Sequence, residues 1–213
     1  MESKTTFLAA IGLCLILGGA RAQQAFGAPL YLSYEGDLTL VTDPYDRFNA
    51  SVYVGAEFSG NYTYDPDVAV DSNPGDPKLG AYNLAGELAA DVGDMHFAAK
   101  DIYAPVRNDY LAGSVTLDQF MILAQTLTSG SLPFNRMSIT IADNTATVFS
   151  SDALPTTLDL ADFPYVKRFE IYADGVETHL YGNLTSLTLT PEPATLSLLA
   201  IGGLAALRRR RKK

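Results

Sequence analysis

Residues 137–149 read MSITIADNTATVF, and their alternation of apolar and polar side chains predicts β-structure. The apolar residues of the first half, one Met and two Ile, would share one face of a strand, because successive strand side chains point to opposite sides. Asp143 and Asn144 then offer a tight turn before a second alternating run. The stretch therefore predicts a β-hairpin.

The same period of two recurs on both sides of this stretch. Phe58 and Tyr64 would share a strand face before it, and Phe169 and Ile171 would share one after it. Turn-forming residues return about every eight to twelve positions, a spacing typical of an all-β fold. We expect residues 23–190 to form a single-domain antiparallel β-sandwich or jelly roll.

One segment leaves more than one interpretation open, and two others predict local turns. Residues 117–127 (LDQFMILAQTL) fit a short helix, but residues 120–127 also fit a buried strand, and we favour the strand. Residues 159–163 (DLADF) predict one helical turn within a loop. Asp174-Gly175 marks a second hairpin turn, because glycine tolerates a positive φ.

The charge of the whole chain conceals a strongly acidic central region. The net charge is −9, but residues 23–190 hold seven basic and 22 acidic side chains, a balance of −15. Such a surface repels nucleic acid, and it repels anionic polymers unless divalent cations bridge the two. We therefore expect no nucleic-acid partner. Cys14 is the only cysteine, so the central region must fold without a disulfide.

The first 22 residues have the composition of a secretory signal peptide. Lys4 precedes an apolar stretch that we expect to be a signal helix, and Ala20-Arg21-Ala22 fits the small-x-small cleavage pattern. Cleavage after Ala22 would leave residue 23 as the mature N-terminus.

The last 23 residues combine a polar break, an apolar run and a basic end. Pro191-Glu192-Pro193 cannot continue a preceding strand or helix. Residues 194–207 carry no charge and would form a transmembrane helix about 21 Å long at ~1.5 Å per residue, short of the ~30 Å hydrocarbon core. The basic tail of residues 208–213 would stay on the cytoplasmic side. Its arginines are Arg208, Arg209, Arg210 and Arg211.

This tail resembles the PEP-CTERM sorting signal of exported bacterial proteins, which is also labelled an ice-binding protein C-terminal domain. The resemblance implies recognition by an exosortase-type membrane protease after export by the secretion machinery. It further implies a transient inner-membrane anchor, cleavage near the Pro-Glu-Pro motif, and delivery to the cell surface or an extracellular polysaccharide matrix. The alternative is an anchor that is never cleaved.

Parts of residues 50–190 also look like a segment found in exported PEP-CTERM proteins. The stretches that carry this likeness are residues 58–65, 71–74, 80–82, 150–155 and 160–163. The resemblance implies an extracellular β-sandwich and supplies no catalytic residues.

The acidic loop of residues 65–76 is a candidate calcium site, since calcium prefers six to eight oxygen ligands. Its glycine is misplaced for an EF-hand, and the alternative is a solvated, turn-rich connection. The candidate ligands are Asp65, Asp67, Asp71, Asn73 and Asp76.

We expect a structural or binding protein rather than an enzyme, with no catalytic residues to assign. The alternative is a glycan-acting hydrolase or a carbohydrate-binding module on a jelly roll. Hydrolysis would need paired carboxylates, for which we consider Glu57, Glu87, Glu170 and Glu177. Sugar stacking would need exposed aromatic rings. The candidates are Tyr45, Tyr53, Tyr62, Tyr64, Tyr103 and Tyr110.

Overall fold

The computed structural model describes residues 29–127, 136–172 and 177–191, which form antiparallel strands and one short helical turn. The all-β prediction is confirmed, including a strand that contains residues 120–127 and a helical turn within residues 159–163. The elements are β1 (Leu30–Thr42), β2 (Glu57–Tyr64), β3 (Leu79–Leu84), β4 (Leu88–Val92), β5 (Met95–Ala112), β6 (Val115–Leu127), β7 (Arg136–Asp143), η1 (Leu160–Asp162), β8 (Val166–Tyr172) and β9 (His179–Pro191).

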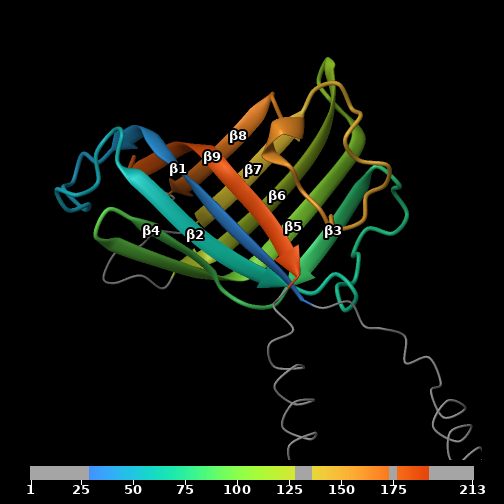
Figure 1. Cartoon of the computed structure of the whole chain (residues 1–213), viewed down its shortest axis with the longest axis horizontal. Helices are drawn as coiled ribbons and strands as arrows, with labels where there is room; N and C mark the ends of the chain where they lie inside the picture. Colours follow the sequence, from blue (N-terminus) through green and yellow to red (C-terminus); the bar gives the residue numbers. More distant parts are fainter. Residues whose placement is uncertain (1–28, 128–135, 173–176, 192–213) are drawn as a thin grey trace, which may run out of the picture.

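The sheet closes on itself. The strands follow the order β4-β2-β1-β9-β8-β7-β6, and β5 pairs with both β4 and β6 at the ends of this row. Within the described residues these eight strands make one barrel, so the predicted sandwich or jelly roll is not the architecture (Figure 1). A period of two cannot separate these folds, because sandwiches and barrels both bury alternate side chains.

Strand β5 is long enough to pair with two different strands along the same edge. It pairs with β4 through residues 95–99 and with β3 through residues 102–107. Asp101, with a positive φ of 58°, lies between the two paired stretches. The strand therefore changes partner at this point, and β3 lies beside the barrel rather than within its closed row.

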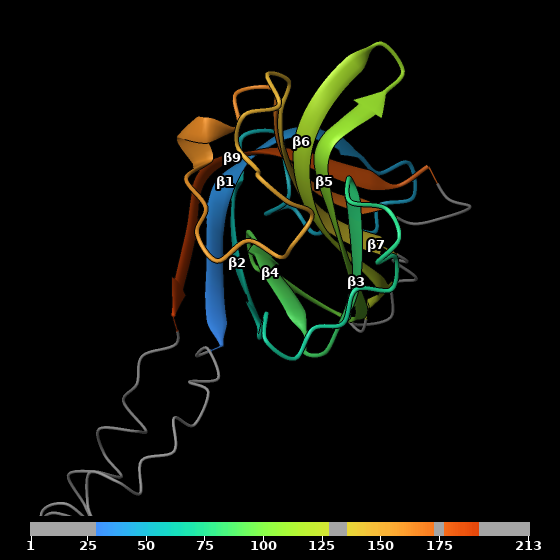
Figure 2. The same cartoon turned by 90° about the vertical axis from the view of Figure 1, so that its right-hand side faces the viewer.

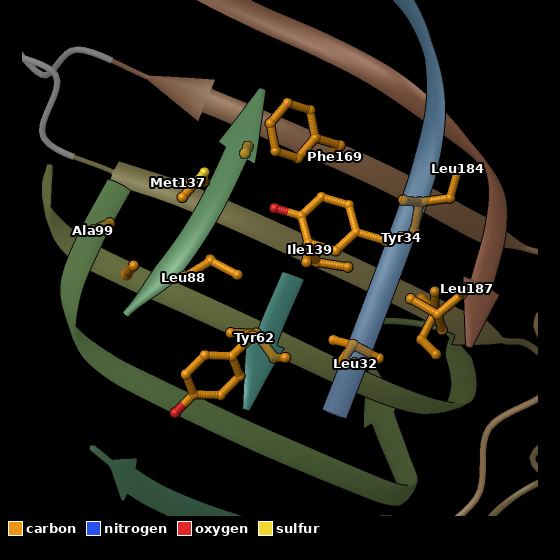
Figure 3. Close-up of a cluster of buried hydrophobic side chains, with 14 of the residues drawn as sticks. Leu32, Tyr34, Tyr62, Leu88, Ala99, Met137, Ile139, Phe169, Leu184 and Leu187 are labelled. Carbon is orange, nitrogen blue, oxygen red and sulfur yellow. The ribbon is translucent and has the colours of Figure 1, made fainter. Parts of the chain in front are cut away.

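Side chains fill the interior of the barrel. Tyr34, Tyr62 and Phe169 lie inside with Leu32 and Ile139, all of them buried (Figure 3). Both tyrosine hydroxyls donate hydrogen bonds to main-chain carbonyl oxygens, at 2.7 Å each. Burying the rings therefore leaves no polar atom of theirs unpaired, which a core requires.

Two bulges set which side chains of β1 and β9 face the core. Thr39 is an extra residue between the paired positions Leu38 and Leu40, so Leu38 is buried while Leu40 is 41% exposed. Thr185 is the extra residue in β9, and Leu184 and Leu187 therefore both face the core. A bulge shifts the alternation by one position, which a strict period of two does not anticipate.

The connection between β7 and β8 spans residues 144–165 and runs across one end of the barrel (Figure 2). The predicted tight hairpin at Asp143-Asn144 is wrong, because the next strand begins only at Val166. The buried Asp118 carboxylate accepts hydrogen bonds from the main-chain N–H groups of Val148 and Phe149, both at 2.8 Å. These bonds hold the connection against the barrel, and its Phe163 side chain enters the core.

The two ends of the barrel chain lie side by side. Leu30, the first residue of β1, pairs with Pro191, the last residue of β9 (Figure 1). The predicted signal helix and transmembrane sorting helix lie outside the described residues, as does the Asp174-Gly175 turn, although β8 and β9 on either side of that turn pair as predicted. Across the described part of the chain, no helix has the length and apolar character needed to cross a membrane.

Candidate functional site

The outer face of β7, β8 and β9 carries a compact group of cationic and aromatic side chains. These strands direct Met137, Phe169 and Ile171 into the core, so the residues between them point outward. Cross-strand pairing then places the outward residues beside one another. We call this group the Arg–Tyr cluster, and it consists of Arg136, Arg168, Glu170, Tyr172, His179 and Tyr181.

Glu170 lies at the centre of the Arg–Tyr cluster. Its side chain is only 10% exposed, and its two carboxylate oxygens lie 3.2 Å from Nη2 of Arg136 and 3.7 Å from Nη2 of Arg168. The two arginine side chains are 40% and 49% exposed. One buried carboxylate therefore positions two guanidinium groups that keep other donors facing solvent, since each carries five N–H groups.

Each arginine of the cluster also stacks on a tyrosine. The guanidinium carbon of Arg136 lies 5.2 Å from the centre of the Tyr172 ring, and that of Arg168 lies 5.7 Å from the Tyr181 ring. The His179 ring lies between the tyrosines, with centroids 6.2 Å from Tyr172 and 5.0 Å from Tyr181. Such cation–π and ring contacts restrict the side chains before any ligand binds.

The protonation of Tyr181 follows from this setting. Burial, followed by the negative charge of Glu170, raises the pKa of Tyr181 above its usual value, and the positive charge of Arg168 opposes the shift. The phenol therefore stays protonated at neutral pH and can donate a hydrogen bond.

The Arg–Tyr cluster contrasts with the charge of the rest of the barrel. Residues 23–190 hold only seven basic side chains, and three of them, Arg136, Lys167 and Arg168, are in β7 and β8. The neighbouring outer face is acidic. A groove of about 840 Å³ there is lined by Glu35, Asp37, Glu57 and Asp91, together with Tyr53.

Within that acidic groove, Asp37 of β1 and Glu57 of β2 occupy directly paired positions. Like charges placed opposite one another on a sheet are destabilising, so the pair disfavours the fold slightly. Both residues are exposed. Asp91 differs from them, because its carboxylate lies 2.7 Å from Nδ1 of His96.

The predicted calcium ligands are engaged in local turns. Asp71 Oδ1 accepts hydrogen bonds from the N–H groups of Asn73 and Ala81, at 2.9 and 2.8 Å. Asp65 and Asp76 each accept from the main-chain N–H two residues ahead, at 3.0 Å. Among the residues that the structure describes, no three His, Cys, Asp or Glu side chains are grouped to hold a metal ion. The calcium site stays a prediction, with Asp67 and Asn73 as its other candidate ligands.

The structure separates the tyrosines considered as sugar platforms. Tyr62 and Tyr64 are buried in the core, whereas Tyr45 and Tyr53 are 62% and 58% exposed. Tyr103 and Tyr110 are half-buried. Of the glutamates considered for hydrolysis, Glu57, Glu87 and Glu177 are exposed, and Glu170 is the centre of the Arg–Tyr cluster.

Sequence reasoning identified Glu170 but missed the arginines and tyrosines around it. A signal was present: Arg168, Glu170 and Tyr172 alternate in β8, and His179 and Tyr181 alternate in β9. The polar side chains on the outer face of an alternating strand can form a site as readily as the apolar side chains on its inner face form a core. Which strands lie next to each other, however, is set by the pairing and not by the pattern within one strand.

The last residues of β9 also belong to a segment that matches a known sorting motif. The model of the PEP-CTERM protein-sorting motif matches residues 189–212. This chain carries a PEP-CTERM sorting motif. The motif identifies an exported protein that is processed by exosortase, a membrane enzyme, and located at the surface or outside the cell. Neither a curated protein nor a solved structure matches the chain.

Proposed function

We propose that the barrel is a binding or structural protein of the cell surface or exopolysaccharide matrix, and not an enzyme. In this proposal the chain is anchored in the inner membrane before exosortase releases it. The Arg–Tyr cluster then takes a carboxylate-bearing polysaccharide on the outer face of β7, β8 and β9. A sugar carboxylate would accept paired N–H donors of Arg136 or Arg168, and tyrosine rings would contact the apolar faces of the sugar.

One observation carries the proposal: the cluster combines preorganised cations with aromatic rings on an otherwise acidic barrel whose interior is filled. Glu170 and the tyrosines hold both guanidinium groups in place, so little side-chain entropy remains to be lost on binding. The surrounding negative charge would direct an anionic polymer to this face and away from the others.

The test is binding of the purified protein, residues 23–191, to polygalacturonate, with dextran as the uncharged comparison. This range contains every strand of the closed barrel. We expect binding to polygalacturonate and a loss of about tenfold or more in Arg168→Glu, because a charged hydrogen bond contributes about 1.5–3 kcal/mol. Increasing salt should weaken the interaction.

Arg107→Glu is the matched control for that charge reversal. Arg107 also stacks on a tyrosine, with its guanidinium carbon 4.8 Å from the centre of the Tyr110 ring, but it lies on β5. Equal losses in Arg107→Glu and Arg168→Glu would show a general charge effect and contradict a site at the cluster. Equal binding to dextran would contradict the carboxylate preference.

The second candidate, a glycan hydrolase, is favoured by the Asp37–Glu57 pair in the acidic groove. Directly opposed strand residues have Cβ atoms about 4.5–5.5 Å apart. Retaining glycosidases place their carboxyl groups about 5–5.5 Å apart. Release of reducing ends by the wild-type protein, and not by Glu57→Gln, would support this candidate.

A further inference from the structure

The sorting motif and the barrel overlap in sequence. The family match begins at Leu189, whereas strand β9 continues to Pro191, so three residues belong to both. In the barrel these residues pair with β1: Leu189 with Leu32, Thr190 with Tyr31, and Pro191 with Leu30. The first residue of the Pro-Glu-Pro motif is thus the last paired residue of a barrel strand.

This end of β9 is held mainly from one side. Strand β8 pairs with β9 only over residues 179–183, and a single bridge links Asp159 to Thr188. Beyond Thr188 the pairings of β9 within the described chain are those with β1. Leu189 is half-buried and packs against the core, while Thr190 is exposed. Terminal pairs of this kind are among the first parts of a fold to open.

Few residues separate the barrel from the apolar run of residues 194–207. Only Glu192 and Pro193 lie between Pro191 and Ala194, where the apolar run begins, and an extended chain spans at most about 10 Å from Pro191 to Ala194. A protease that takes its substrate as an extended chain must bind main-chain groups that β1 already occupies near this end.

We propose that the last pairs between β1 and β9, residues 30–32 with residues 189–191, gate the sorting reaction. Exosortase binds the motif when these pairs are open and cannot bind it when they are closed. The stability of this end therefore sets the processing rate, while the core of the barrel stays folded. The proposal rests on processing by exosortase and not on the polysaccharide-binding function.

The test compares full-length variants in a bacterium that has an exosortase, with an exosortase-deficient strain as the baseline. Processing is followed by pulse-chase as the loss of the tail mass. Inserting Gly-Ser-Gly-Ser between Thr190 and Pro191 preserves the motif and moves it away from the barrel. We expect this variant to be processed several-fold faster than the wild type. An unchanged rate would overturn the proposal.

A cross-link tests the opposite direction. Residues 23–213 contain no cysteine, and directly opposed antiparallel positions lie within disulfide range. We expect the double variant Tyr31→Cys/Thr190→Cys, once oxidised, to lose processing and to regain it on reduction. The control Asp37→Cys/Asn183→Cys joins the same two strands farther from the motif and should be processed normally.

The outcomes distinguish a failure of the proposed gate from a failure of its premise, which is processing by exosortase. Processing of the oxidised Tyr31→Cys/Thr190→Cys chain at the wild-type rate would overturn the gate. Equal arrest of both cross-linked variants would also overturn it, because opening of the whole β1–β9 pair would then be needed. A wild-type chain that keeps its tail in the exosortase-containing strain would overturn the premise of processing itself.

Discussion

A single carboxylate, that of Asp118, organises the end of the barrel where the long connection crosses. It is fully buried and accepts three main-chain hydrogen bonds, from Asp109, Val148 and Phe149. It is also paired across the strands with Asp143, another buried carboxylate. Burial raises the pKa of Asp143, but hydrogen bonds from Thr145, Ala146 and Thr147 outweigh this effect and lower it below its usual value.

Replacing Asp118 should therefore cost stability without affecting the Arg–Tyr cluster. We expect Asp118→Ala to lower the free energy of unfolding by about 2–4 kcal/mol, because three main-chain N–H groups lose the buried carboxylate that accepts from them. Denaturant unfolding measures the change. The exposed Asp94→Ala is the matched control and should change stability by no more than about 0.5 kcal/mol. Equal losses in both variants would contradict the anchoring role of Asp118.

At the scale of single elements, β1 and β9 are shaped by glycines that admit aromatic rings. A Cβ atom at Gly182 would collide with the Phe58 ring, and one at Gly36 would collide with the Phe58 ring and with the main-chain oxygen of Asn183. Phe58 in turn stacks on Phe169, with ring centroids 4.4 Å apart. These glycines thus give the ring its space in the core.

We expect Gly182→Ala to destabilise the barrel by about 1–3 kcal/mol, as is usual when a packed core is overfilled. Thermal or denaturant unfolding measures the loss. Gly75→Ala is the control, because a Cβ atom there meets nothing within 4 Å. Adding Phe58→Leu should relieve part of the Gly182→Ala loss in a double-mutant cycle. Strictly additive losses would show that the two positions do not collide.

These elements show how much of the fold could be predicted from the sequence. Alternation in residues 58–64 and 169–171 identified strands and their buried faces correctly. A strict period of two would place Leu40 on the buried face with Leu38, but Leu40 is exposed, because the bulge at Thr39 depends on how β1 pairs with β9, a strand about 140 residues later in the chain. The Arg–Tyr cluster was missed for the same reason: its members come from three strands, and only their register brings them together.

At the scale of the whole molecule, the closed barrel encloses several tyrosines in one core. Burial raises the pKa of Tyr34, Tyr62 and Tyr64 above the usual value, with smaller contributions from Asp91 on Tyr34 and from Tyr62 on Tyr64. The folded protein therefore retains protons that the unfolded chain releases above about pH 10. Closure couples this ionisation to unfolding of the entire domain.

The consequence is a loss of stability in alkaline solution. Because the folded pKa values are raised, this contribution is fully present below about pH 10 and declines as the pH rises further. We expect the melting temperature to fall above that pH. The tyrosinate absorbance of the buried residues should appear together with the loss of the β-sheet circular dichroism signal. Full ionisation of all tyrosines in a still-folded barrel would contradict this expectation.

The adjacent ends of β1 and β9 also determine how the protein would respond to mechanical force. Pulling residue 30 against residue 191 would peel the two strands apart one pair at a time, which takes little force. Pulling residue 42, at the other end of β1, against residue 191 would instead draw the two strands along each other. The hydrogen bonds to β1 would then be loaded in parallel as a shear joint. The same strand pair would therefore resist force along its strands far better than it would resist separation of the two termini.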